Sequence, residues 1–261
     1  MIRQIRIELL KLTTVRFGYV LLGFAVTLTG IFAAIQASRA GTADGVAPLD
    51  TYSGLSTIVT GGVWGLLFAA VLGATASSGE FRHHTATLTY LATPNRTRVL
   101  AATVVASAVG GALFGLAVYL AAIAVGLGFV ASRGYPVSIG AVTFVRFGLG
   151  HLVGGALLAG LGAVLGSLIR SQLAVVIGVF VWSIIIESLI GGLFTAIRPY
   201  LPYTVGTTLA GTPLGEAGFG PAHGVSGGTP LPFAAATALL VGITVVLAAI
   251  AARTTVRRDI A

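Results

Sequence analysis

The chain of 261 residues has no cysteine, a single lysine and few charged residues of either sign. The absence of cysteine excludes disulfides, thiolate metal ligands and thiol catalysis. Charged residues make up 8% of the chain, whereas about 25% is usual in a soluble domain. With 56% hydrophobic residues and a mean hydropathy of +1.00, such a chain lacks the polar residues to cover a water-exposed surface. We therefore expect a membrane protein.

Six long apolar runs follow one another, at residues about 17–37, 55–78, 99–131, 147–169, 171–197 and 231–252. Each reaches the roughly 20 residues that an α-helix needs to cross a hydrocarbon core of about 30 Å. The runs are apolar on all sides, unlike the alternating strands of a membrane barrel. The sequence predicts an all-α membrane protein with six transmembrane helices, in one domain over residues 1–261, because no connection is long enough to fold alone.

The basic residues predict the orientation of these helices. If the N-terminus is inside, the outer segments hold only Arg39, Arg133, Arg146 and Arg198, and the other 11 of the 15 basic residues lie inside. Cytoplasmic loops carry such an excess, so both termini are expected in the cytoplasm, and the arginine-rich composition favours a bacterial cytoplasmic membrane. The net charge of +8 fits this bias and anionic lipid headgroups, and no nucleic-acid partner is expected.

Two segments outside the spans have a recognisable pattern. Within residues 1–16, four apolar residues recur at helical spacing: Ile2, Ile5, Leu9 and Leu12. They predict an interfacial helix along the inner leaflet, with a frayed cationic tail as the alternative. Residues 198–230 are rich in proline and glycine but begin with apolar and aromatic residues. They predict a short or re-entrant helix at the outer surface, followed by a loop.

Several motifs of enzymes are present only in part. Gly224–Gly228 matches the G-x-S-x-G of a hydrolase, but Ser226 lies in a loop without the strand and helix that this motif requires. No phosphate loop is present, because the only lysine is Lys11. The adjacent His83 and His84 point about 100° apart on a helix, so no metal site is expected. The chain is not expected to be an enzyme.

Glu187 and His151 are ionisable residues within predicted spans, where such groups are costly. One hypothesis is that the pair couples transport to protons or ions. The favoured alternative is structural: Glu187 accepts hydrogen bonds within the bundle, or pairs with Arg198, and holds the outer helix ends together. Glycine pairs four residues apart, Gly111/Gly115, Gly150/Gly154 and Gly162/Gly166, predict close helix packing, either inside the bundle or across a dimer.

Residues 79–98, GEFRHHTATLTYLATPNRTR, interrupt the apolar chain on the predicted inner side. A helix over residues 80–92 places Phe81, Leu88 and Leu91 on one side, and Pro94 ends it. Such a helix is suited to lie on the lipid surface or to insert into a groove of a cytoplasmic partner. An inert connection is less favoured, because Arg170-Ser171 alone reverses the chain elsewhere.

Two stretches resemble the permeases of ABC type-2 transporters. Gly79-Glu80-Phe81-Arg82, followed by Thr85, Leu91, Pro94, Arg96 and Leu100, is similar to the segment after the second span of that family. Leu165–Leu193, with its short arginine turn, Trp182 and Glu187, is similar to the region of the fourth and fifth spans. The resemblance in topology covers the whole chain, and the matching residues are scattered rather than grouped in one compact motif.

The resemblance implies a permease subunit of an exporter. A cytoplasmic coupling helix would dock on a separate ATP-binding-cassette ATPase, which binds ATP and Mg, and this chain would hold no cofactor. A second copy of the permease, in a homodimer, would complete the transporter. The docking residues would be Glu80, Phe81, Arg82, His83, Thr85, Leu88, Leu91, Pro94 and Arg96.

An amphiphilic drug, peptide or lipid is the expected substrate, because the spans are apolar. Two alternatives stay open: an ion-coupled secondary transporter that uses Glu187, and a membrane scaffold without transport.

Overall fold

The computed structural model describes residues 1–42, 46–82, 95–214 and 229–254, and every regular element in these ranges is a helix. In chain order they are α1 (Ile2–Thr14), α2 (Arg16–Arg39), α3 (Tyr52–Thr60), α4 (Val63–Arg82), α6 (Arg96–Ser132), α7 (Ala141–Ile169), α8 (Gln172–Phe180), the π-helix η1 (Val181–Ile186), α9 (Glu187–Leu193), the 3-10 helix η2 (Arg198–Tyr200), α10 (Pro202–Leu209) and α11 (Phe233–Arg253). The predicted all-α fold is confirmed for these residues.

Six segments are long and apolar enough to cross a membrane: Arg16–Arg39, Tyr52–Glu80, Arg96–Ser132, Ala141–Ile169, Gln172–Leu193 and Phe233–Arg253. They coincide with the six predicted spans, which confirms a multi-pass membrane protein. Two predicted boundaries differ by more than three residues: the fourth segment begins at Ala141 and not at residue 147, and the fifth ends at Leu193 and not at residue 197. The second segment is interrupted at Gly61-Gly62, where α3 ends and α4 begins.

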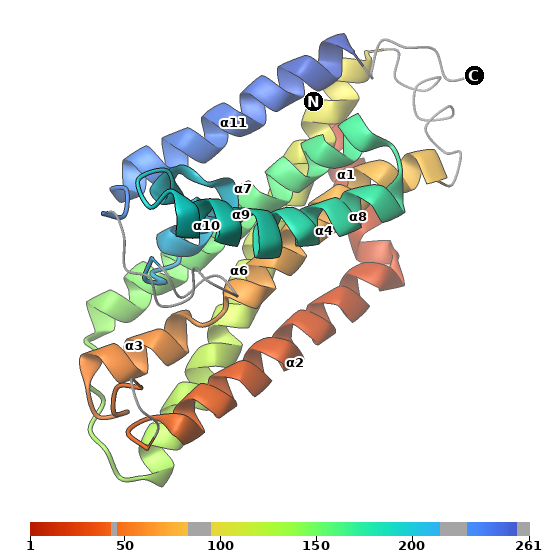
Figure 1. Cartoon of the computed structure of the whole chain (residues 1–261). Helices are drawn as coiled ribbons and strands as arrows, with labels where there is room; N and C mark the ends of the chain where they lie inside the picture. The colour runs from red at the N-terminus through yellow and green to blue at the C-terminus, as the bar shows by residue number, and fades with distance from the viewer. Residues whose placement is uncertain (43–45, 83–94, 215–228, 255–261) are drawn as a thin grey trace.

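The spans form one bundle with α4 and α7 inside it (Figure 1). α2 and α11 lie on opposite flanks, and α11 is the least buried of the six spans. The start of α6, the end of α7 and the end of α11 pack together around Leu100, Val164 and Ala251. α1, which leads into the first span, contacts the end of α4 through Lys11 and Glu80 and the first half of α6 through Leu12 and Gly110. The start of the first span and the end of the last therefore lie at the same end of the bundle. That this end faces the cytoplasm stays a prediction.

Glycine brings the inner helices close together, and α7 uses it against three partners. On α7, Gly150 and Gly154 face the backbone of α10, Gly155 faces Gly111 of α6, and Gly162 and Gly166 face the backbone of α4. A Cβ atom at each of these positions would overlap backbone atoms of the partner helix. The three predicted glycine pairs therefore pack inside the bundle, which answers the question that the sequence left open.

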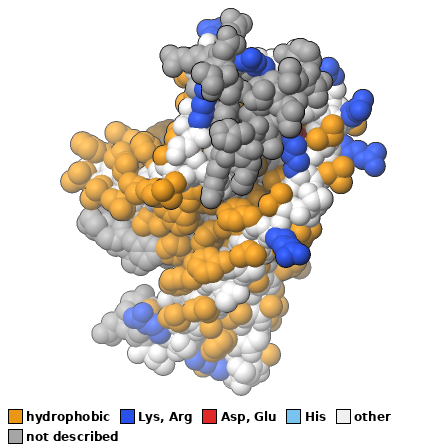
Figure 2. Space-filling model, turned by 90° about the vertical axis from the view of Figure 1, so that its right-hand side faces the viewer, with side chains coloured by type: hydrophobic (Ala, Val, Ile, Leu, Met, Phe, Trp, Pro, Cys, Tyr) orange, Lys and Arg blue, Asp and Glu red, His pale blue; other side chains and the backbone are white. Residues whose placement is uncertain are grey.

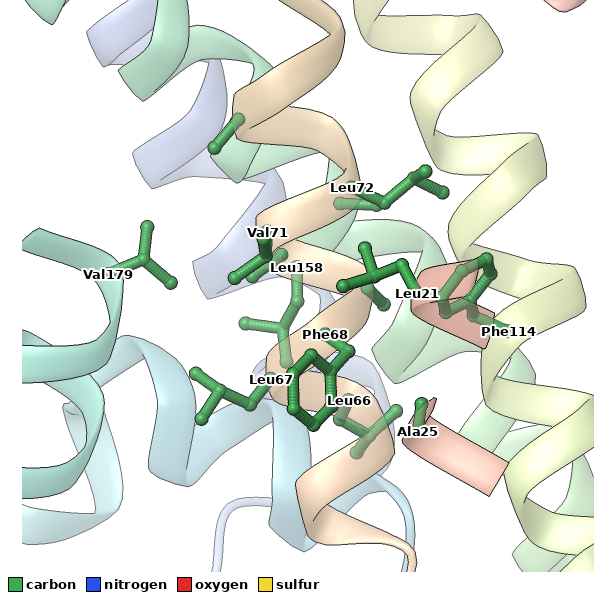
Figure 3. Close-up of a cluster of buried hydrophobic side chains, with 14 of the residues drawn as sticks. Leu21, Ala25, Leu66, Leu67, Phe68, Val71, Leu72, Phe114, Leu158 and Val179 are labelled. Carbon is green, nitrogen blue, oxygen red and sulfur yellow. The ribbon is translucent and has the colours of Figure 1, made fainter. Parts of the chain in front are cut away.

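α4 carries the centre of the largest hydrophobic cluster. Figure 3 shows Leu66, Leu67, Phe68, Val71 and Leu72 of α4 with side chains from α2, α6, α7 and α8 around them. The Phe68 ring meets Phe24 of α2 edge-on, with 5.3 Å between ring centroids. α4 therefore packs against helices on several sides, namely α2, α6, α7, α8 and α10.

The outer surface of the bundle is apolar. Figure 2 shows a broad band of hydrophobic side chains over the middle of one face, with lysine and arginine mostly above and below it. Large side chains such as Val142, Leu173 and Leu193 are 84%, 72% and 75% exposed. Exposed apolar area on this scale is typical of a surface that lipid covers.

Candidate functional site

The described part of the predicted coupling segment belongs to two long helices. Glu80, Phe81 and Arg82 are the last residues of α4, and Arg96 is the first residue of α6. The prediction that a separate helix begins at Glu80 is therefore corrected: α4 continues through Gly79, because a glycine without an adjacent stop signal does not end a helix. The other predicted docking residues, His83, Thr85, Leu88, Leu91 and Pro94, lie outside the described residues.

Glu80 takes part in a charged cluster with the N-terminal helix. The Lys11 ammonium of α1 donates to Glu80 at 2.5 Å and to Glu8 at 2.8 Å. Glu8 is only 4% exposed, although a helix surface this close to the start of the chain is usually solvated. Burial alone would lower the pKa of Lys11, but its bonds to Glu8 and Glu80 outweigh burial and raise it. Lys11 is therefore cationic at neutral pH and ties α1 to the end of α4.

α1 is consequently more than a surface helix. Its side chains Ile5, Leu9 and Leu12 are partly buried, and Leu12 packs against the cluster around α4. Ile2, which was expected on the same apolar face, is 85% exposed. The role of Glu8 and Lys11 in this helix was not predicted from the sequence. Their spacing of three residues was the available signal, since it allows a pair on one helix.

Glu187 caps the N-terminus of α10 from another helix. Its Oε1 accepts from the backbone N–H of Tyr203 and from Trp182 Nε1, both at 2.8 Å. Its Oε2 accepts from the backbone N–H of Thr204 at 2.9 Å and from the Thr204 hydroxyl at 3.0 Å. Leu201, the residue at the N-cap position, provides no side-chain bond. A carboxylate at a helix N-terminus is favoured by the helix dipole, and here four donors surround it.

The π-helix η1 determines where Glu187 points. Trp182 and Glu187 are five residues apart, and their hydrogen bond spans η1. In an α-helix, two residues at this separation are roughly 140° apart around the axis. In a π-helix, with its i→i+5 bonds, five residues make about one turn. The wider turn therefore brings Trp182 and Glu187 to the same side of the helix, where the amide groups of α10 lie.

His151 lies at the break between α3 and α4. The side chain is fully buried, and Nδ1 is 2.9 Å from the Phe147 carbonyl oxygen. Because a carbonyl only accepts, Nδ1 carries the proton and Nε2 carries a lone pair, for which the described residues supply no hydrogen-bond partner. Nε2 faces Gly62, where a Cβ atom would be 2.9 Å away. The Tyr119 ring covers the imidazole at 4.9 Å between centroids.

Glu187 and His151 belong to different surroundings. Glu187 bonds to residues at the N-terminus of α10. Gly150, the residue before His151, contacts Leu209 at the C-terminus of α10. α10 has eight residues, so its length is about 12 Å at 1.5 Å per residue. Within the described ranges no hydrogen bond joins the two ionisable side chains. The geometry gives a structural role to Glu187 and no shared relay to the pair.

The described part of the bundle has few groups that could bind a metal ion or a phosphate. In the residues that the structure describes, no three His, Asp or Glu side chains are grouped as metal ligands would be. The one lysine, Lys11, is engaged with Glu8 and Glu80 and is not part of a phosphate loop. A comparison with known protein families found none that matches this chain, and a comparison with curated proteins found no match either.

Proposed function

We propose that this chain is the membrane-spanning permease subunit of an ATP-binding-cassette exporter in a bacterial cytoplasmic membrane. Two copies of the chain would work with two copies of a cytoplasmic ATPase, which binds ATP and Mg. The sequence resemblance motivates this proposal. The observation that carries it is the path of close packing, backbone against backbone, that runs from α4 through α7 to α10.

The path begins at the α1–α4 connection. The resemblance places the docking site for the ATPase in the residues that follow Glu80, and Lys11 ties this end of α4 to α1. α4 packs against α7 through Gly73, Gly162 and Gly166 with backbone against backbone. A contact without intervening side chains is stiff, because no rotamer change can absorb a displacement. A force on the segment after Glu80 would therefore move α4 and α7 together.

The path ends at α10. Gly150 and Gly154 of α7 lie against the backbone of Leu209 and Gly206, so a displacement of α7 reaches α10 directly. The apolar surfaces of the spans suit an amphiphilic substrate such as a drug, peptide or lipid, and export is the direction that the resemblance implies.

An ion-coupled transporter is the less favoured function. Both oxygens of Glu187 accept two hydrogen bonds each from the protein. A carboxylate so fully bonded to protein groups is poorly placed to take up and release an ion in each cycle. A scaffold without transport would not require a stiff connection across the bundle.

Affinity purification of the tagged chain from its native membrane in mild detergent tests the proposal. We expect a soluble ATPase to co-purify in stoichiometric amount. The double substitution Leu88→Asp and Leu91→Asp should release it, because both residues are predicted to fill the groove of the partner. Thr13→Asp, on the exposed side of α1, is the matched control and should retain it. Purification of the chain alone, under conditions where other membrane complexes survive, would refute the proposal.

A further inference from the structure

α10 is held at its C-terminal end by close packing. The backbone of Leu209 lies against Gly150 of α7, and the Thr212 hydroxyl, just beyond α10, donates to the Thr60 carbonyl at 3.1 Å. This carbonyl belongs to the last turn of α3, at the break before α4. Val205 and Leu209 add apolar contacts with α11. The C-terminal end of α10 therefore moves only with the helices around it.

At the N-terminal end of α10, Tyr203 packs in the cluster around α4, but the first backbone amides are bonded by a single side chain. The amides of Tyr203 and Thr204 are bonded by Glu187, and the N-cap residue Leu201 offers no substitute. These amides are buried, so without Glu187 they would be unbonded donors in an apolar environment. The position of one carboxylate thus decides whether these two buried amides are bonded.

The position of that carboxylate depends on how far α9 is rotated, relative to α8, about the axis that the two helices share. α8 packs against α4 and α7, and α9 continues it after η1. If η1 became α-helical without losing a residue, everything beyond it would turn by about 100°, the angle of one residue. Glu187 would leave Trp182 and the amides of α10. Short π segments within α-helices are found frequently at functional sites, where such a change is available.

We propose that η1 and Glu187 form a latch that holds the N-terminal end of α10 in the bundle, and that a change of η1 from π- to α-helix releases it. In the latched state the carboxylate has four donors but the helix has the less favourable π geometry. In the released state the helix gains regular α-helical bonds while α10 loses its cap. Each state thus gains one kind of hydrogen bond and loses another, so the latched and released states are the two alternative arrangements that a switch requires.

The role of the latch in transport rests on the proposed function: release of the N-terminal end of α10 would open the bundle beside α9. The latch itself is a property of this chain, however, and can be measured without substrate, ATP or a partner. Failure to find an ATPase would therefore refute the proposed function and leave the latch standing. Failure of the labelling experiment below would refute the latch alone.

The absence of cysteine from the sequence allows a thiol to report on α10. Thr207 of α10 is fully buried, and Thr207→Cys places a thiol there. The rate at which N-ethylmaleimide labels this thiol in the purified full-length chain measures how often α10 leaves its position. Ser107 of α6 is also fully buried, so Ser107→Cys is the matched control for general loosening of the bundle.

Three changes in the Thr207→Cys background test the latch. Glu187→Gln replaces one accepting oxygen by an amide donor, and we expect labelling about tenfold faster, since a hydrogen bond to a charged group has at least that effect. Trp182→Phe removes only the bond across η1, which goes to the same carboxylate, and should also accelerate labelling about tenfold. Deletion of Ile185 should slow labelling about tenfold, because removing one residue makes η1 α-helical while α8 and α9 keep their present phase.

The deletion separates a latch from a static cap. Ile185 is 51% exposed, so its removal empties no part of the core. If the Ile185 deletion labels as fast as the parent, the phase of η1 does not control α10 and the proposal is wrong. It is equally wrong if Glu187→Gln and Trp182→Phe leave the rate unchanged, or accelerate Ser107→Cys labelling to the same degree. Unchanged rates in these two substitutions would refute the proposal even if the deletion variant does not fold.

Discussion

Gly162→Ala tests whether α4 and α7 pack backbone to backbone. The added Cβ atom would overlap the Ala70 carbonyl oxygen, its nearest neighbour, and would lie 2.9 Å from the carbonyl carbon, whereas carbon atoms in contact are about 3.5 Å apart. The overlap is with backbone, so a rotamer change cannot remove it and the two helices must separate by about 0.6 Å or more. Separation also loosens the contacts of Gly73 and Gly166 with the same pair of helices.

We expect Gly162→Ala to lower the free energy of unfolding by about 3 kcal/mol, the upper end of the usual cost of overpacking. For a chain of this size, that corresponds to a fall in melting temperature of about 6–12 °C. The assay is thermal unfolding of the detergent-solubilised chain, followed by tryptophan fluorescence. Gly242→Ala on α11 is the control, because nothing lies within 4 Å of its Cβ position. Equal melting temperatures for both variants would show that α4 and α7 are not in backbone contact.

Three further predictions concern side chains. Lys11→Met should lower the free energy of unfolding by about 2 kcal/mol, because it removes the cation bonded to the buried Glu8 carboxylate. Adding Glu80→Gln should restore part of the loss, and no restoration in the melting curve would exclude a direct pair of Lys11 and Glu80. Gly62→Ala should destabilise the bundle by about 2 kcal/mol through its overlap with the imidazole. His151→Ala should then reduce the cost of Gly62→Ala in a double-mutant cycle, and strict additivity would contradict their contact. Tyr119→Phe should cost about 1 kcal/mol by removing its hydroxyl bond to a backbone carbonyl of α7, and an unchanged melting temperature would count against that bond.

The six spans could be predicted because each has to be long and apolar, and both properties are visible in the sequence. The break at Gly61-Gly62 was not predicted. No charge or proline marks it, and glycine is frequent throughout the chain. What distinguishes this glycine pair is its surroundings, the imidazole of His151 and the bond from Thr212 to Thr60. Those contacts join residues far apart in the sequence, so no local pattern contains them.

The candidate site was predicted in part. Glu187 was singled out as an ionisable residue in a span, and a structural role was favoured, with Arg198 as one possible partner. The described bonds go to the amides of Tyr203 and Thr204. A backbone amide has no signature in the sequence, because every residue except proline has one. The π-helix η1 was not foreseen either, since Val181–Ile186 reads as an ordinary apolar helix.

Glycine pairs were recognised from their spacing, but their partners were not. The pairs on α7 face different helices, α10 and α4, although both have the same spacing of four residues. Their direction depends on where they lie around the axis of α7. That direction becomes meaningful only when the neighbouring helices are in place, so spacing predicts closeness and not the identity of the partner.

The contacts of α7 also determine how this fold tolerates divergence. Because α4 and α10 meet α7 through backbone atoms, the bundle depends on where side chains are missing. On the lipid-facing sides of α2 and α11, leucine, isoleucine, valine and alanine are free to replace one another. Chains that keep glycine at positions 73, 150, 154, 162 and 166 could thus share this architecture while little else in their sequences agrees. Relatives of the protein should be sought by the spacing of these glycines rather than by overall identity.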